Sequence, residues 1–112
     1  MLSARFRFHS RGGVRFTYKN GRSIRGQNLS VIFAPNARHK QRFAVVVSKK
    51  VAKSAVVRNR IRRRIYESIR LELPHFKPAC DLIFTVYSSE LSQTDFNTLR
   101  LSVRNLLNQI QA

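Results

Sequence analysis

The stretch SKKVAKSAVVRNRIRRRIYESIRLEL, residues 48–73, decides the fold because it predicts one long helix with two different sides. Apolar residues recur every four positions and form a ridge along one side, namely Val57, Ile61, Ile65, Ile69 and Leu73. One position further along, a second ridge consists of Arg58, Arg62, Tyr66 and Arg70. Ser54 can cap the first turn through its hydroxyl, and Pro74 predicts the end of the helix. We therefore expect a helix from about residue 55 to residue 73 that buries one side and presents guanidinium groups and a phenol on the adjacent side.

The same stretch concentrates positive charge without a single acid between its cations. These are Lys49, Lys50, Lys53, Arg58, Arg60, Arg62, Arg63 and Arg64. Arginine can form two parallel hydrogen bonds to a phosphate and can stack on a base. A solvated basic face is the alternative interpretation, but solvated helices normally mix both signs of charge. The pattern therefore favours a polyanionic partner.

Charge is also distributed unevenly over the 112 residues, which carry a formal net charge of +17. Residues 1–66 hold 18 of the 22 lysines and arginines and none of the five acids. This asymmetry indicates a nucleic acid, or less readily a membrane surface, on one side of the fold. No apolar run approaches the roughly 20 residues that span a bilayer, and arginines interrupt the N-terminus where a signal peptide would be apolar. With Cys80 as the only cysteine, we expect a cytoplasmic protein without a disulfide.

The rest of the chain predicts a single domain, residues 1–112, with a basic N-terminal arm over residues 1–9 anchored by Phe6 and Phe8. Ser10 can cap a helix that runs to about Asn20 before Gly21, and Ser92 to Asp95 resembles a capping box before a last amphipathic helix. Strands are expected at residues 22–26 (an edge strand), 29–33, 43–47 (a central strand) and 81–87. The order α-β-β-β-α-β-α predicts an α+β two-layer sandwich with helices packed on a four-stranded sheet.

Residues for catalysis are scarce. The acids Glu67, Glu72, Asp81, Glu90 and Asp95 are scattered, and His9, His39 and His75 show no metal-binding spacing. A two-metal nuclease needs several converging carboxylates, which this sequence does not readily supply. A histidine pair acting as acid and base is the remaining alternative. We predict no catalytic side chain and no metal site in the protein itself.

The run AVVRNRIRR at residues 55–63, preceded by VSKK at residues 47–50, resembles the signature of the bacterial ribonuclease P protein subunit. The resemblance extends over nearly the whole chain and implies the same element order, with a left-handed crossover around the basic helix. It implies a protein that binds a catalytic RNA and the 5′ leader of precursor tRNA. The RNA subunit would then carry the chemistry of leader removal and hold Mg²⁺, so we expect no cofactor bound by the protein alone and one protein per RNA.

The resemblance and the cationic helix together suggest two groups of site residues. The expected RNA-binding group is Lys49, Lys50, Lys53, Arg58, Asn59, Arg60, Arg62, Arg63 and Tyr66, where Tyr66 stands at a position that is often arginine in the family. The expected leader cleft lies between the first helix and the sheet and involves Val14, Tyr18, Leu29, Val31 and Phe33, with Val14 at a position that is usually aromatic. Aromatic side chains in such a cleft would stack on unpaired bases.

Two other classes of protein remain open at this point. A small ribosomal or generic structural RNA-binding protein fits the composition equally well, but not the spacing between Ser-Lys-Lys and Arg-Asn-Arg. A stand-alone basic nuclease is disfavoured by the few carboxylates and the unpaired histidines.

Overall fold

The computed structural model describes residues 2, 4–7, 11–36 and 40–111, and their helices and strands follow the order predicted from the sequence. The elements are α1 (Arg11–Asn20), β1 (Arg22–Arg25), β2 (Leu29–Pro35), β3 (Arg42–Val46), α2 (Ala55–Glu72), β4 (Cys80–Val86) and α3 (Phe96–Gln111). Three short 3-10 turns join them, namely η1 (Ala4–Phe6), η2 (Leu73–His75) and η3 (Ser89–Ser92). The predicted α+β class with a four-stranded sheet is confirmed.

The four strands lie in the order β1-β2-β4-β3. β1 pairs with β2 and β2 with β4 in antiparallel fashion, whereas β3 and β4 are parallel. A parallel pair needs a crossover connection, and α2 provides it. The prediction that residues 43–47 form a central strand is wrong, because β3 lies at the edge of the sheet. The left-handed sense of the crossover stays a prediction.

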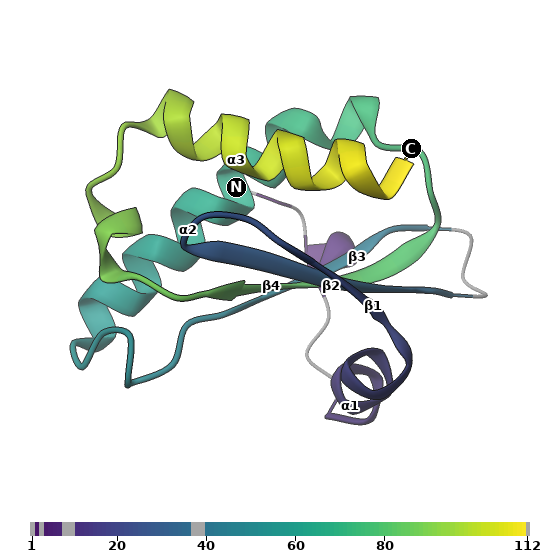
Figure 1. The fold of residues 1–112 in the computed structure, drawn as a ribbon, viewed down its shortest axis with the longest axis horizontal. Coiled ribbons are helices and arrows are strands. Elements are labelled where there is room, and N and C mark those ends of the chain that lie inside the picture. Colours follow the sequence, from purple (N-terminus) through teal and green to yellow (C-terminus); the bar gives the residue numbers. More distant parts are fainter. Residues whose placement is uncertain (1, 3, 8–10, 37–39, 112) are drawn as a thin grey trace.

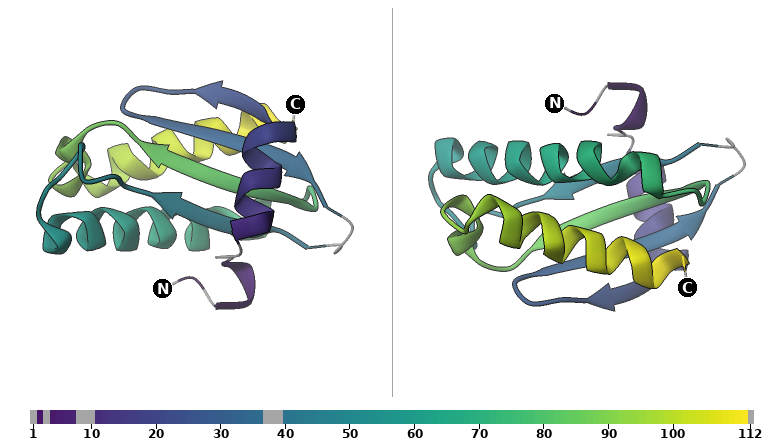
Figure 2. Two further views of the ribbon diagram at one scale, coloured as in Figure 1. Left: turned by 90° about the horizontal axis from the view of Figure 1, so that it is seen from below. Right: turned by 90° about the horizontal axis from the view of Figure 1, so that it is seen from above.

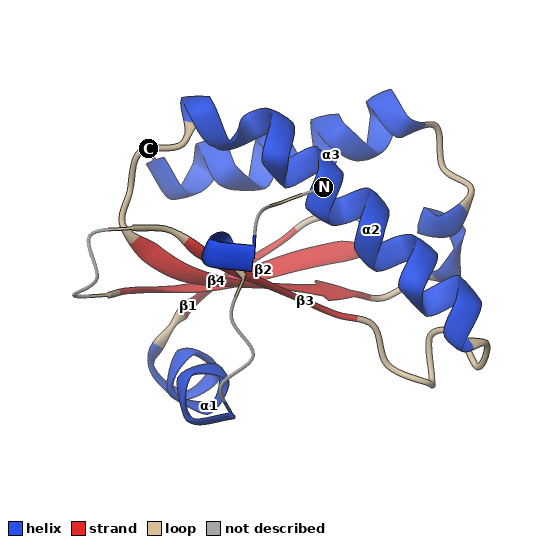
Figure 3. Ribbon diagram, turned by 180° about the vertical axis from the view of Figure 1, so that it is seen from behind, coloured by secondary structure: helices blue, strands red, loops and turns tan. Residues whose placement is uncertain are grey.

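Helices cover both faces of the sheet, but unequally. Figures 1 and 3 show α2 and α3 side by side over one face, whereas α1 alone lies across the other face. Alternate residues of the strands supply the two sides. Leu29, Val31, Phe43, Leu82 and Phe84 are fully buried beneath α2 and α3, and a smaller cluster around Ala44 and Ile83 lies on the side of α1. Seen from below, α1 crosses the strands near one end of the sheet (Figure 2).

The long basic helix forms as its sequence predicts. The side chain of Ser54 accepts a hydrogen bond from the backbone N–H of Val57 at 3.4 Å, so the predicted N-cap is confirmed. Ile61, Ile65 and Ile69 are fully buried against the sheet and α3. Each such side chain contributes roughly 1.5–3 kcal/mol relative to an exposed one.

The N-terminal arm and the segment before α3 differ in part from the expectations. Phe6 packs against the core as predicted, but Leu2 is buried as well, and residues 4–6 form a 3-10 turn where an irregular arm was expected. The expectations for Phe8 and Ser10 lie outside the described residues. The capping box is wrong, because Ser92 belongs to η3 while Asp95 alone caps α3, accepting from the N–H of Thr98 at 3.2 Å.

Gly21 lets α1 lie close to the sheet. Its N–H donates to the carbonyl of Thr17 at 2.8 Å, which ends the helix. A Cβ atom at this position would lie 2.5 Å from that carbonyl oxygen and 2.8 Å from the carbonyl oxygen of Phe33 on β2. Any larger residue would therefore push α1 away from the strand.

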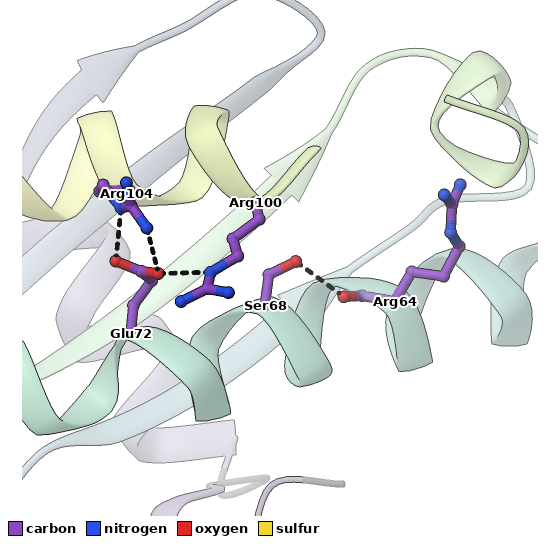
Figure 4. Close-up of polar contacts among 5 residues, drawn as sticks. All are labelled: Arg64, Ser68, Glu72, Arg100 and Arg104. Atoms are coloured by element: carbon purple, nitrogen blue, oxygen red, sulfur yellow. Dashed lines mark hydrogen bonds and ion pairs between the residues drawn. The ribbon is translucent and has the colours of Figure 1, made fainter. Parts of the chain in front are cut away.

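Glu72, at the end of α2, ties the two large helices together. Its carboxylate is 4% exposed and accepts hydrogen bonds from Arg100 at 2.7 Å and from Arg104 at 2.8 Å, both on α3 (Figure 4). The hydrogen bond from Arg104, followed by that from Arg100, lowers the pKa of Glu72. A carboxylate with a lowered pKa stabilises the fold above the ordinary pKa of glutamate, and this contribution is lost as the pH falls.

We expect Glu72→Gln to lower the free energy of unfolding at pH 7 by about 1–3 kcal/mol, because the charged hydrogen bonds to two half-exposed arginines are lost. The difference from the wild type should shrink toward pH 3, where the wild-type carboxyl becomes protonated. Urea denaturation at both pH values measures it. Glu67→Gln is the matched control, since Glu67 pairs with Arg70 on the surface and such a pair contributes about 0–1 kcal/mol. An equal effect of both variants would contradict the role assigned to Glu72.

Candidate nucleic-acid interface

The cationic side of α2 and of the turn before it faces solvent. Three lysines of this turn and three residues of the helix are exposed, namely Lys49, Lys50, Lys53, Asn59, Arg60 and Arg63. These six side chains, which we call the cationic face, are all members of the RNA-binding group expected from the sequence. The buried isoleucines on the opposite side of α2 fix the direction in which this face points.

Arg58 and Arg62 are half-buried and are engaged within the protein. The guanidinium of Arg58 donates to the carbonyls of Ala52 at 2.9 Å and Lys53 at 2.8 Å. It therefore holds the lysine-bearing turn against the start of α2. Arg62 donates to Oδ1 of Asn59 one turn earlier on the helix. Both side chains shape the cationic face as well as adding to its charge.

Tyr66 does not present its phenol as expected. The residue is only 7% exposed and belongs to the same buried core as Val45 on β3. Burial raises the pKa of its hydroxyl, so the phenol stays neutral in the physiological range. The second ridge of α2 is therefore interrupted at Tyr66, which lies in the core between the cationic positions Arg62 and Arg70.

Arg64 has a structural role that the sequence analysis did not assign. Its guanidinium donates to the carbonyls of Leu91 and Thr94, and so attaches α2 to the segment before α3. Figure 4 shows the side chain extending from α2 toward that segment. Desolvation, followed by the field of Arg60, lowers the pKa of Arg64. The sequence feature that could have predicted this role is the spacing of Arg64, which follows Ile61 by three positions and so lies beside the buried ridge.

A second surface lies on the other side of the sheet, next to α1. Val14 packs on the cluster that contains Ala44, Ile83 and Ile32. Tyr18 is 46% exposed, and its hydroxyl lies 3.5 Å from Oγ1 of Thr85 on β4. These two of the expected cleft residues therefore do lie between α1 and the sheet.

The prediction that three residues of β2 line this cleft is wrong. Leu29 and Val31 are fully buried beneath α2 and α3, and Phe33 packs against the same core. The alternate residues of β2, Ser30 and Ile32, face α1 instead. This choice of face follows from burial, because two helices can cover the wholly apolar set of side chains whereas one helix leaves part of its face open.

Two further side chains of this surface were missed. Tyr87 after β4 is 44% exposed, and Arg25 on β1 lies beside it. The guanidinium of Arg25 lies 4.4 Å from the ring centre of Tyr87, whose hydroxyl lies 2.8 Å from Oγ of Ser30. We call Tyr18, Arg25, Ser30, Thr85 and Tyr87 the aromatic surface. The alternation of side chains along β4 could have predicted the position of Tyr87, because it places Tyr87 on the same face as Thr85 and Ile83.

Within residues 2, 4–7, 11–36 and 40–111, no group of three or more His, Cys, Asp or Glu side chains is placed to hold a metal ion. Asp81 instead accepts from Arg42 at 2.8 and 2.6 Å and from Asn36 at 2.7 Å. Burial raises the pKa of the Cys80 thiol to about 12. In the same described part of the chain, no helix combines the length and the apolar character needed to cross a membrane.

A cationic helix on one side of the sheet and exposed aromatic side chains on the other are typical of small basic proteins that bind nucleic acids. The chain belongs to the Ribonuclease P protein family, whose sequence model matches residues 2–111. It is 40% identical over 90 residues to the ribonuclease P protein component of Thermoanaerobacter sp. (strain X514), covering 80% of this chain and 76% of that protein. It is 36% identical over 90 residues to that of Caldanaerobacter subterraneus subsp. tengcongensis, with the same coverage. The structure of the RNase P protein from Thermotoga maritima superposes with a TM-score of 0.85 at 27% identity, over 95% of this chain and 98% of that one.

Neighbouring arginines on α2 should separate stability from RNA binding. We expect Arg64→Ala to lower the free energy of unfolding by about 1–3 kcal/mol, because two charged hydrogen bonds to backbone carbonyls are lost. Arg63→Ala should leave stability unchanged within about 0.5 kcal/mol, because Arg63 is exposed. It should instead weaken RNA binding and reduce the slope of log affinity against log salt by about 0.7. Denaturation and salt-dependent binding titrations test both, and a stability loss in Arg63→Ala would contradict the assignment.

Proposed function

We propose that this protein is the protein subunit of ribonuclease P, which binds the catalytic RNA and promotes removal of the 5′ leader from precursor tRNA in the cytoplasm. The observation that carries the proposal is the Arg58–Arg63 motif on a helix whose other side is locked in the core. A polyanion gains most from cations that are already held in place, because little side-chain and backbone freedom is then lost on binding.

In this proposal the cationic face contacts the catalytic RNA. Arg60 and Arg63 supply planar forks that match phosphate oxygens, and the three lysines extend the positive field along the preceding turn. Backbone contacts of this kind position two molecules without reading sequence. The chemistry of hydrolysis, including the Mg²⁺ that it needs, is assigned to the RNA subunit, and the protein acts by electrostatics and shape with one copy per RNA.

The aromatic surface is proposed to hold the single-stranded leader. Tyr18 and Tyr87 offer ring faces on which unpaired bases can stack, and Arg25 adds a cation beside them. The hydroxyl of Thr85 lies on the sheet beside Tyr18 and can bond to sugar or base edges, whereas Ser30 is buried and its hydroxyl positions that of Tyr87. Stacking tolerates any base, which suits a leader of variable sequence.

Reconstitution tests the proposal directly. We expect the protein to stimulate leader removal by a bacterial ribonuclease P RNA at low magnesium, where the RNA alone is weakened by phosphate repulsion. The double variant Arg60→Ala/Arg63→Ala should need a roughly 10- to 100-fold higher concentration for half-maximal stimulation, since two phosphate contacts of about 1 kcal/mol each are lost. Both side chains are exposed, so the thermal unfolding transition should be retained.

The alternatives give different results in the same assay. Tight RNA binding without any stimulation would favour a ribosomal or generic RNA-binding protein. Cleavage of precursor tRNA by the pure protein with magnesium, in the absence of the RNA subunit, would favour a stand-alone nuclease. Either result would overturn the proposed function.

The aromatic surface should distinguish precursor from mature tRNA. We expect Tyr18→Ala and Tyr87→Ala each to weaken binding of precursor tRNA to the reconstituted enzyme by about 1–3 kcal/mol, because one stacked base is lost. Binding of mature tRNA, which lacks the leader, should not change. Leu101→Ala is the control, since Leu101 is an equally exposed apolar residue, 49% exposed, on α3. Equal losses for precursor and mature tRNA would show that these tyrosines do not contact the leader.

A further inference from the structure

A hollow of about 550 Å³ lies between α2, the edge strand β3 and the N-terminal segment that contains Arg7. Its floor is formed by Ala44, Val45 and Tyr66. Arg7 pairs with Phe43 through an isolated parallel bridge, which brings the N-terminal segment alongside β3. We call this hollow the edge notch, and it lies on the α2 side, apart from the aromatic surface next to α1.

The rim of the edge notch consists of hydrogen-bond donors. Arg62 and Arg63 line it from α2, and Arg7 lines it from the other side. The remaining rim residue, Asn59, already accepts a hydrogen bond on its amide oxygen from Arg62, so its NH₂ group is what it offers to a ligand. A ligand that fits this rim must be rich in acceptors and negatively charged.

Arg7 adds an observation that points to a ligand. Its Nε atom is buried and has no hydrogen-bond partner among the described residues. A buried donor without a partner is unfavourable, and in native proteins such a group usually has an acceptor. The guanidinium also lies 5.7 Å from the ring centre of Tyr66, so the notch contains a flat cationic group above an aromatic floor.

The size of the edge notch and its partly apolar lining favour an organic ligand over a bare inorganic anion. Pockets for organic ligands measure roughly 300–1,000 Å³, and the edge notch falls within this range. The apolar floor suits a flat ring, and a guanidinium can stack on a base. Proteins that recognise RNA commonly take up unpaired bases that are splayed out of a helix.

We propose that the edge notch binds one unpaired guanosine nucleotide of an RNA strand, with its base stacked on the Arg7 guanidinium, its O6/N7 edge toward Asn59 and Arg62, and its phosphate on Arg63. Guanine presents two adjacent acceptors, O6 and N7, on one edge, whereas adenine presents one acceptor and one donor there. On this edge, a rim made of donors can pair with both acceptors of guanine, whereas it leaves the N6 donor of adenine facing a donor. This inference rests on the proposed RNA-binding role of α2 and adds a base-selective contact to it.

Titration of the full-length protein with guanosine 5′-monophosphate, followed by NMR, tests the inference. We expect saturable shifts at the Val45 amide, the Tyr66 ring and the Asn59 side-chain amide. Adenosine 5′-monophosphate should bind about tenfold more weakly, and inorganic phosphate should not reproduce the shift of the Tyr66 ring. Equal affinity for all three ligands, or shifts confined to Tyr18 and Tyr87, would overturn the proposal.

A matched pair of variants removes the same charge from the same helix. Arg63→Ala, inside the notch, should weaken binding of the nucleotide by about fivefold or more, whereas Arg60→Ala, outside it, should change affinity less than about twofold. Equal losses of affinity in the two variants would show that only the overall positive charge attracts the nucleotide, and would overturn the proposed site. No ribonuclease P RNA is present in this titration, so the titration and the reconstitution assay test different proposals. Absence of nucleotide binding would overturn the edge-notch proposal alone, and failed reconstitution would overturn the proposed function alone.

Discussion

The burial of Ile61, Ile65 and Ile69 is the contact on which the cationic side of α2 depends. The cations of this helix cluster in its first half and in the turn before it, where the helix macrodipole is already positive. An isolated helix with this charge pattern would be unstable, because like charges repel at spacings of three and four residues. The apolar contacts beneath α2, together with the attachments of Arg64 and Glu72, hold the helix in place against this repulsion. A bound polyanion would relieve this repulsion. RNA binding would therefore recover the free energy that the repulsion costs the unbound protein.

Much of this helix could be predicted from the sequence because its determinants are local. The four-residue apolar period, the Ser54 cap and Pro74 each act within a few residues, and each is confirmed by the structure. The position of β3 could not be predicted in the same way. An apolar run such as residues 43–47 indicates burial on both faces, and β3 is buried on both faces although it lies at the edge. Strand order depends on pairing between distant segments, which a local pattern does not contain.

The same distinction between local patterns and contacts with distant segments applies to the residues of the candidate site. Arg60 and Arg63, which the sequence placed in the RNA-binding group, are solvent-facing, because their positions lie away from the apolar ridge. Tyr66 was not, because its environment comes from β3, about 20 residues away in the chain. For β2 the alternation predicted two sets of side chains, but which set faces α1 depends on how many helices cover each face. The wholly apolar set lies under two helices and the set containing Ser30 lies under one, a rule that the composition of the strand could have supplied.

The sheet separates the two surfaces and also sets the distance between them. α2 is fixed to one face by its isoleucines, and α1 is fixed to the other by Val14 and by the close approach at Gly21. β3 contributes to both sides, since Ala44 belongs to the cluster next to α1 whereas Val45 belongs to the core under α2. If α2 holds the catalytic RNA and the aromatic surface holds the leader, as proposed, then the rigid sheet fixes one RNA relative to the other. A protein subunit can accelerate a reaction by positioning alone, because fixing two reactants in a productive geometry removes much of the entropic part of the barrier.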